Sequence, residues 1–167
     1  CTKCTPGLYQ DTIGQTSCVE CTAGLFTNDV QQSECLNCPA GYAQESKGMK
    51  DCSQCTSGQA QSDKGQTKCT DCLAGQHSES ELESKACTHC PAGYAQESKG
   101  MKDCLQCQAG FISVKLIGSD DCVPCAKGTH VNLTSQQTLC DNCQVGLYQD
   151  ERSGTLTCKK CPHGYIN

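Results

Sequence analysis

CPAGYAQESKGMKDC spans Cys38–Cys52, and the same fifteen letters return unchanged at Cys90–Cys104. Identity of this length within one chain is typical of a tandem array, so a repeat architecture is expected. Outward from the two copies, the looser pattern C-x-x-C-x-x-G tiles residues 1–167 at a spacing of 17 or 18 residues. The repeats start at Cys1, Cys18, Cys35, Cys52, Cys69, Cys87, Cys104, Cys122, Cys140 and Cys158. We therefore predict one continuous array, and a segment of a longer chain because it begins and ends within the pattern.

The composition does not support a single globular core. Leu, Ile, Val and Phe together number 23 of the 167 residues, and there is no Trp. This is below the level at which chains usually fold on hydrophobic burial, roughly 20%. The 20 cysteines exceed the share of roughly 8–10% that marks a disulfide scaffold. Disulfides persist in oxidising compartments, so a secreted, extracellular or cell-surface protein is expected.

The glycines and aromatic residues keep fixed places in the repeat. Each of the ten C-x-x-C pairs is followed by a glycine three residues after its second cysteine, and the other six glycines each lie four residues before the next pair. Such fixed glycines indicate backbone angles that a side chain would disfavour. We interpret each repeat as a small two-stranded β-hairpin with about three residues per strand, the second glycine lying in a short turn. The predicted fold class is an elongated rod or solenoid of ten disulfide-rich hairpin units of about 17–18 residues, with little regular secondary structure.

Three cysteine chemistries fit the spacing C-x2-C-x13-C-x2-C. Four thiolates at this spacing could hold zinc. Adjacent pairs could instead form four-cysteine modules with two disulfides, or each repeat could close its own loop in a ladder. The identical copies lie three repeats apart, so chemistries that use repeats two at a time would bond identical sequences differently. The ladder treats both copies alike. A staggered pairing, from the first cysteine of one pair to the second cysteine of the next, would do so too, and connectivity cannot be deduced from spacing alone.

The ladder is the favoured pairing. It predicts the disulfides Cys4–Cys18, Cys21–Cys35, Cys38–Cys52, Cys55–Cys69, Cys72–Cys87, Cys90–Cys104, Cys107–Cys122, Cys125–Cys140 and Cys143–Cys158. Cys1 and Cys161 would then bond to repeats beyond the two ends.

The sequence carries few other signals of chemistry. Asn132-Leu133-Thr134 is an N-glycosylation sequon, and Asn132 is the predicted site of attachment. No set of residues indicates catalysis, and we expect no enzyme activity, no cofactor and no metal site. The net charge is -5 and the basic residues are scattered, which argues against nucleic-acid binding. No apolar run approaches the ~20 residues of a membrane span.

The motif C-x-x-C-P-A-G-Y, best developed at Cys35–Cys55 and Cys87–Cys107, resembles the ephrin-receptor-like cysteine-rich repeat. It is similar in appearance to growth-factor-receptor and tumour-necrosis-factor-receptor cysteine-rich modules, and to the C-x-x-C-rich surface antigens of protists, including ciliates. The resemblance covers all 167 residues and weakens at Ser78–Ala86 and Thr129–Leu139. It implies an extracellular, disulfide-linked, elongated stalk or coat, and no particular ligand.

Two principal functions are therefore expected. The first is a structural role in a surface coat, stalk, appendage or filament, with self-association or neighbouring repeats of the same protein as partners. The second is a ligand-binding receptor or adhesin ectodomain, in which divergent loops such as Ser78–Ala86 or Phe111–Gly118 carry specificity. An intracellular zinc array is a remote third alternative.

Overall fold

The computed structural model describes residues 1–79, 84–150 and 157–165. Within them the fold is nearly all hairpin: eighteen short strands form nine two-stranded antiparallel sheets, and one 3-10 turn, η1, covers Leu133–Ser135. The strands are β1 Leu8–Tyr9, β2 Val19–Glu20, β3 Leu25–Phe26, β4 Leu36–Asn37, β5 Tyr42–Ala43, β6 Ser53–Gln54, β7 Gln59–Ala60, β8 Thr70–Asp71, β9 Gln76–His77, β10 Thr88–His89, β11 Tyr94–Ala95, β12 Leu105–Gln106, β13 Phe111–Ser113, β14 Cys122–Pro124, β15 Thr129–Val131, β16 Cys140–Asn142, β17 Leu147–Tyr148 and β18 Lys159–Lys160. The predicted disulfide-rich hairpin repeats are confirmed.

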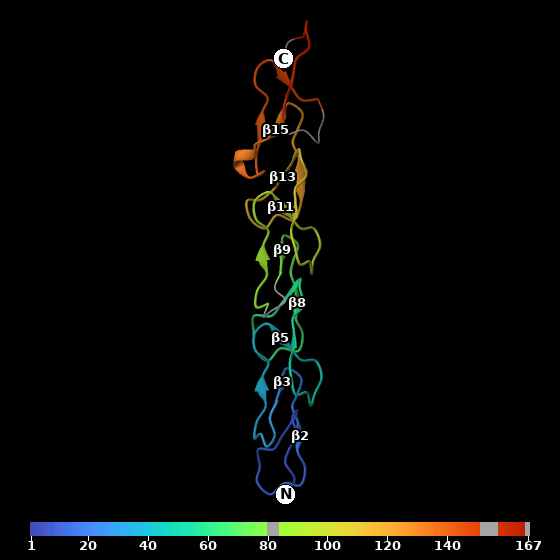
Figure 1. The fold of residues 1–167 in the computed structure, drawn as a ribbon, viewed down its shortest axis with the longest axis vertical. Coiled ribbons are helices and arrows are strands. Elements are labelled where there is room, and N and C mark those ends of the chain that lie inside the picture. The colour runs from blue at the N-terminus through green and yellow to red at the C-terminus, as the bar shows by residue number, and fades with distance from the viewer. Residues whose placement is uncertain (80–83, 151–156, 166–167) are drawn as a thin grey trace. The chain divides into compact units, whose positions relative to one another are not determined.

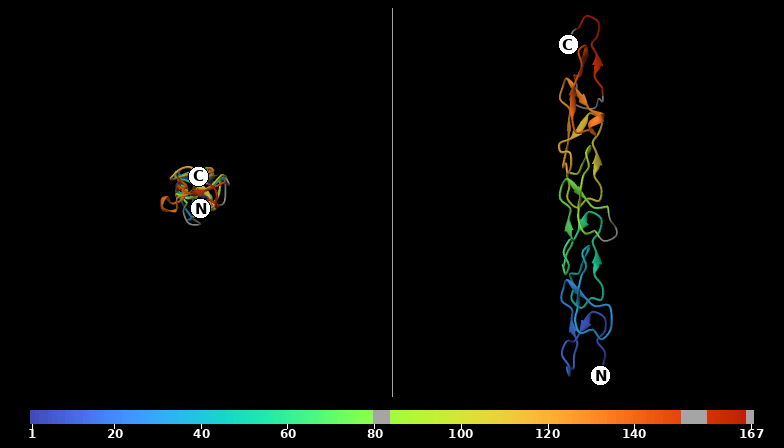
Figure 2. Two further views of the ribbon diagram at one scale, coloured as in Figure 1. Left: turned by 90° about the horizontal axis from the view of Figure 1, so that it is seen from above. Right: turned by 90° about the vertical axis from the view of Figure 1, so that its left-hand side faces the viewer.

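The chain divides into two compact units. Unit 1 contains residues 1–72 and 78–87, with strands β1 to β8, and unit 2 contains residues 73–77 and 88–167, with strands β9 to β18. Within unit 1, the hairpins follow one another in chain order. The labelled strands β2, β3, β5 and β8 show this order in Figure 1, and the colours show it in the right-hand view of Figure 2. The hairpins of unit 2, from β9 to β15, do the same. Each hairpin therefore has its sequence neighbours as its spatial neighbours within its unit.

Each hairpin pairs the strand after one glycine with the two residues inside the next C-x-x-C. In the first hairpin, Leu8 is opposite Glu20 and Tyr9 is opposite Val19. The second cysteine of the pair then donates its backbone N–H to the glycine carbonyl, as Cys21 does to Gly7 at 3.0 Å. This bond recurs in all nine hairpins of the described residues at 2.8–3.0 Å. The strands are mostly two residues long, shorter than the three expected, because the C-x-x-C pair leaves only two residues between its cysteines.

The sequence suggested a short hairpin turn at the second glycine; Gly14 and Gly65 do lie in local turns, but the connections between the strands are longer than predicted. The connection between β1 and β2 runs from residue 10 to residue 18, and Gly14 lies within it at a φ of +85°. In the third repeat, the corresponding Gly48 has a φ of +67° and donates its N–H to the carbonyl of Cys21 in the preceding repeat at 2.8 Å. The left-handed conformation is as expected, and the loop packs on a neighbour.

The interior is formed by cystine and small residues, and no single hydrophobic core is present in the described residues. The buried apolar positions are Ala43, Ala60, Ala95, Val131 and eight second cysteines of the pairs, namely Cys4, Cys21, Cys38, Cys55, Cys72, Cys90, Cys107 and Cys125. Cys21, Cys38 and Cys90 are each 0% exposed. The aliphatic and aromatic side chains of the strands remain partly accessible, so hydrophobic burial contributes less here than in a globular domain.

Successive repeats are joined by backbone hydrogen bonds that involve the first glycine. Gly24 donates its N–H to the carbonyl of Gln44 in the next repeat at 2.7 Å, and Gly41 donates to Gln61 at 2.7 Å. The same bond is present at Gly7, Gly58, Gly75 and Gly128. Only main-chain atoms take part at these six glycines, so the bond does not depend on particular side chains; at Gly93 the N–H donates instead to the hydroxyl of Ser113 at 3.0 Å.

The first glycine also contacts the repeat after next. A Cβ on Gly24 would collide with the carbonyl oxygen of Gly65, two repeats further along the chain. The same contact joins Gly7 to Gly48 in unit 1 and Gly75 to Gly118 in unit 2. At these positions glycine is favoured for two reasons, a positive φ and the close approach of another part of the backbone, whereas at Gly128 and Gly146 only the positive φ applies.

A buried glutamine closes the polar loop of many repeats. The side chain of Gln44 is 6% exposed: its Nε2 donates to the carbonyl of Asp51 at 2.8 Å, and its Oε1 accepts from the N–H of Ser46 at 3.0 Å. One amide thereby satisfies a backbone group at each end of the loop. The same pair of bonds is made by Gln10, Gln61 and Gln96.

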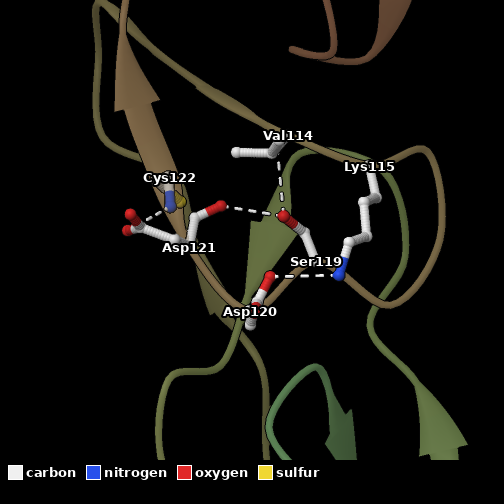
Figure 3. Close-up of polar contacts among 6 residues, drawn as sticks. All are labelled: Val114, Lys115, Ser119, Asp120, Asp121 and Cys122. Atoms are coloured by element: carbon white, nitrogen blue, oxygen red, sulfur yellow. Dashed lines mark hydrogen bonds and ion pairs between the residues drawn. The ribbon is translucent and has the colours of Figure 1, made fainter.

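The loop after β13 achieves the same closure with a serine. Ser113 replaces glutamine there, and the hydroxyl of Ser119 accepts from the N–H of Val114 at 3.0 Å and donates to the carbonyl of Asp121 at 2.8 Å (Figure 3). Asp121 immediately precedes Cys122, as Asp51 precedes Cys52, so the same carbonyl is bonded in both loops. Ser119 is 0% exposed, which makes this bond part of the loop's interior.

The effects of the positive φ and of the close backbone contact can be separated by substitution. Gly14 and Gly24 have nearly equal φ, +85° and +83°, but nothing lies within 4 Å of a Cβ on Gly14. Gly14→Ala should lower the free energy of unfolding by about 1–2 kcal/mol, the cost of a left-handed L-residue. Gly24→Ala should cost a further ~1–3 kcal/mol from overpacking. Denaturant titration of the unreduced protein measures both, and equal losses would contradict the contact with Gly65.

Candidate functional site: the disulfide-linked contact between repeats

The structure contains nine disulfides, each joining the second cysteine of one pair to the first cysteine of the next. They are Cys4–Cys18, Cys21–Cys35, Cys38–Cys52, Cys55–Cys69, Cys72–Cys87, Cys90–Cys104, Cys107–Cys122, Cys125–Cys140 and Cys143–Cys158. The partners are 14 or 15 residues apart in every case. These pairs coincide with those of the ladder.

The two ends of the disulfides lie in different surroundings, except in Cys143–Cys158, where both cysteines are partly exposed. The second cysteine, such as Cys38, is fully buried beneath the hairpin, whereas its partner Cys52 is partly exposed at the end of the loop. The bond therefore fixes the loop to the interior of its own repeat. Closure of a loop of about 15 residues restricts the unfolded chain and can contribute roughly 3 kcal/mol. Repeated along the array, this restriction takes the place of an aliphatic core.

The duplicated segments adopt the same structure in different compact units. Ala43 and Ala95 are each 6% exposed, and their strands have equivalent registers, with Tyr42 opposite Gln54 and Tyr94 opposite Gln106. Their glutamines make matching bonds: Gln96 Nε2 donates to Asp103 at 2.8 Å, as Gln44 does to Asp51. Identical sequence thus receives identical bonding, which is the requirement that favoured the ladder over pairing by twos.

Disulfide bonding removes the thiolates that a zinc array would need. Cys1 and Cys161 are the two cysteines with free thiols. His130, Cys143 and Cys158 lie close enough to share an ion, with His130 Nδ1 at 3.4 Å from Cys158 Sγ, but the two sulfurs are bonded to each other. Thiolate is the form of cysteine that binds metal, so this cluster does not offer the ligands of a zinc site.

The predicted glycosylation site begins the 3-10 turn η1. The side chain of Asn132 accepts from the N–H groups of Thr134 and Ser135 at 2.8 and 3.2 Å, and its Nδ2 donates to Asp141 at 2.7 Å. Leu133 and Thr134 are exposed. An N-linked sugar replaces one of the two amide hydrogens, so the attached asparagine would retain one N–H for Asp141.

The left-handed position of the second glycine is occupied by glutamine in two loops. Gln31 has a φ of +63° and donates its N–H to the carbonyl of Cys4 at 3.0 Å, the bond that Gly48 makes to Cys21. Gln136 and Gln137 have φ values of +55° and +60° in the loop that contains η1. The contact between repeats therefore fixes the loop conformation even where the residue disfavours it.

The two divergent loops differ in what they expose. In the loop Ser78–Ala86 the hydroxyls of Ser78 and Ser84 hydrogen-bond to each other in the interior, and residues 80–83 lie outside the described residues. In the loop after β13, Val114, Leu116 and Ile117 are 56%, 64% and 63% exposed. Three neighbouring aliphatic side chains at the surface make this loop the more apolar of the two.

An exposed ion pair links neighbouring repeats at one copy of the duplicated segment. Lys68 Nζ lies 2.7 Å from Glu45 Oε1. The hydrogen bond to Glu45, together with the attraction of its charge, raises the pKa of Lys68. Near the other copy, the hydrogen bond of the Asp120 carboxylate to its own backbone N–H, followed by its contact with Lys115, lowers the pKa of Asp120. The identical segments thus face neighbours of different charge.

The disulfide ladder can be tested directly by peptide mapping. Digestion without reduction should release Cys38 linked to Cys52 and Cys4 linked to Cys18, because the cysteines of each pair meet beneath their own hairpin. Mass spectrometry of the linked peptides, compared with a reduced digest, identifies the partners. A peptide that joins Cys4 to Cys21 would contradict the ladder and support four-cysteine modules, in which two adjacent C-x-x-C pairs are joined by two disulfides.

Comparison with known proteins identifies the repeat at the N-terminal end. Residues 1–31 and 15–48 match the family model described as tyrosine-protein kinase ephrin type A/B receptor-like. No curated protein matches the sequence significantly. In the part of the chain that the structure describes, no helix is long and apolar enough to cross a membrane. Residues 1–48 are therefore similar to the ephrin-receptor-like cysteine-rich repeat, and the described hairpins beyond them follow the same disulfide plan.

Proposed function

We propose that this chain is part of an extracellular structural protein that builds a surface coat, stalk, appendage or filament. The observation that carries the proposal is the main-chain contact between repeats, in which Gly24 bonds to Gln44 and packs on Gly65. Because these contacts involve backbone atoms and glycine, they do not depend on particular side chains: the hydrogen bond recurs at Gly7, Gly41, Gly58, Gly75 and Gly128, and the close approach recurs at Gly7 and Gly75. Repeat proteins of this kind can lengthen without a new core.

The extracellular location is supported by the cysteine chemistry and by the family match. Nine disulfides occur within the described residues, and disulfides in such density are typical of secreted and cell-surface proteins. The ephrin-receptor-like repeat is likewise an extracellular type of domain. In this role the protein has no catalytic function, and its partners are copies of itself or further repeats of its own chain.

Electron microscopy of the unreduced protein, as isolated, tests the structural role. We expect regular filaments or sheets with a periodicity set by the array, since repeats that contact their neighbours favour ordered assembly. A reduced and alkylated sample is the control and should lose the order, because the loops are no longer closed. Isolated single particles in the unreduced sample would contradict the structural role.

A receptor or adhesin ectodomain is the second candidate. It is favoured by the exposed aliphatic side chains of Val114, Leu116 and Ile117, which a purely structural repeat would not need. Contiguous apolar surface of this kind often marks an interaction site. Isolated particles in the microscope would direct attention to this loop.

We also propose that Asn132 carries an N-linked glycan. Its sequon lies in a partly exposed turn, and one amide hydrogen remains for Asp141 after attachment. Treatment of protein from its native source with a peptide-N-glycosidase should lower its mass by one glycan and convert Asn132 to Asp. The protein with Asn132→Gln is the control and should show no change, and an unmodified Asn132 in the native protein would contradict the proposal.

A further inference from the structure

We propose that a groove beside the second duplicated segment binds a lysine side chain presented by a different protein. The groove has a volume of about 460 Å³ and lies entirely within unit 2. Its lining combines the apolar side chains of Met101, Leu105 and Phe111 with the carboxylates of Glu97 and Asp121. This goes beyond the structural role, because a coat protein and a receptor could both use such a site.

The first duplicated segment makes an ion pair that the second one lacks. Glu45 corresponds to Glu97, and Lys68, which immediately precedes Cys69, corresponds to Asp121, which immediately precedes Cys122. In the first copy the Lys68 ammonium satisfies Glu45 at 2.7 Å. In the second copy an acid stands in the place of the lysine, and Glu97 makes no ion pair among the described residues.

The apolar walls are also specific to the second copy. Leu105 stands where the first copy has Ser53, and Phe111 stands where it has Gln59. Leu105 is 69% exposed and Met101 is 42% exposed, so an occupant that covers them would remove apolar surface from water. Three differences thus separate the two copies. The first copy has a polar surface with an ion pair, whereas the second has an apolar groove whose acids make no ion pair among the described residues.

A lysine side chain has the chemistry that this groove would recognise. Its four methylene groups pack on apolar surface while its ammonium group reaches for charge or solvent. Asp121 accepts one hydrogen bond, from the N–H of Cys122 at 2.7 Å through Oδ1 (Figure 3), and a lysine ammonium would add a second partner to this carboxylate. The chain itself places a lysine against the glutamate in the first copy, which favours lysine over an apolar occupant.

The two methionines allow a test with an internal control. Met49 and Met101 are the only methionines of the chain, occupy the same place in identical sequences, and are 41% and 42% exposed. With methyl-labelled methionine, the NMR spectrum therefore reports one groove signal and one control signal, assigned with Met49→Leu. The probe is the peptide acetyl-Gly-Leu-Lys-Leu-Gly-amide, and its matched control has norleucine in place of lysine.

The lysine peptide should shift the Met101 signal saturably and leave the Met49 signal unchanged. The norleucine peptide should bind at least about tenfold more weakly, because it has no charge for Glu97 and Asp121. Asp121→Asn, which keeps an acceptor for Cys122, should weaken binding, and Asp121→Lys should abolish it by supplying the lysine internally.

A variant in which the groove residues are introduced into the first copy tests whether they are sufficient for binding. The triple variant Ser53→Leu, Gln59→Phe, Lys68→Asp should make the Met49 signal respond to the lysine peptide. Equal responses of both methionines in the unaltered protein, equal binding of the norleucine peptide, or unchanged binding by Asp121→Lys would overturn the proposal. A Met101 shift that depends on protein concentration without peptide would assign the groove to a second copy of this chain, and would overturn it too.

Discussion

The structure depends on the close packing of main chain around the first glycine of the repeat, as at Gly7, Gly24 and Gly75. Gly24 donates its N–H to the next repeat, accepts a hydrogen bond from Cys38 through its carbonyl, and leaves room for the carbonyl of Gly65 two repeats away. A side chain at this point would disturb all three contacts. The constraint explains why little aliphatic surface is buried, and why the interior consists mainly of backbone, cystine, alanine and small or amide side chains such as those of Thr27 and Gln44.

The disulfides and these glycine contacts have complementary effects. Each disulfide, such as Cys38–Cys52, fixes one loop to its own repeat, whereas the glycine hydrogen bonds join that repeat to its neighbours. Small two-stranded sheets are marginal by themselves in water. Closure of the loops by cystine and by the buried glutamines reduces the freedom of the unfolded chain, so that the modest contacts between repeats are sufficient to order the array. Surface side chains can then differ between repeats, as they do around the groove at Leu105.

The hairpin class and the places of the structural glycines could be predicted because both depend on local spacing. The two-residue strands and the long loops that follow from them could also have been predicted, because the C-x-x-C pair leaves only two residues between its cysteines. The contact of Gly24 with Gly65 could not, because it arises from packing between repeats. The role of the loop glutamine could have been predicted from the sequence. One position of the repeat, six residues after a second cysteine, is occupied by Gln10, Gln44, Gln61, Gln96 and Gln149. A polar residue that keeps a fixed place indicates a buried hydrogen bond. The groove required the structure, since Glu97 lies in one repeat and Leu105 and Asp121 lie at opposite ends of the next.

Amide hydrogen exchange of the oxidised chain tests the packing around the first glycine most directly. The N–H groups of Gly24 and Gly41 donate across the boundary between repeats, whereas the N–H of Gly14 makes no hydrogen bond within the described residues. Exchange at Gly24 and Gly41 should be at least about tenfold slower than at Gly14, because exchange requires the repeats to separate locally. Equal rates at the three glycines would contradict the claim that main-chain contacts join the repeats.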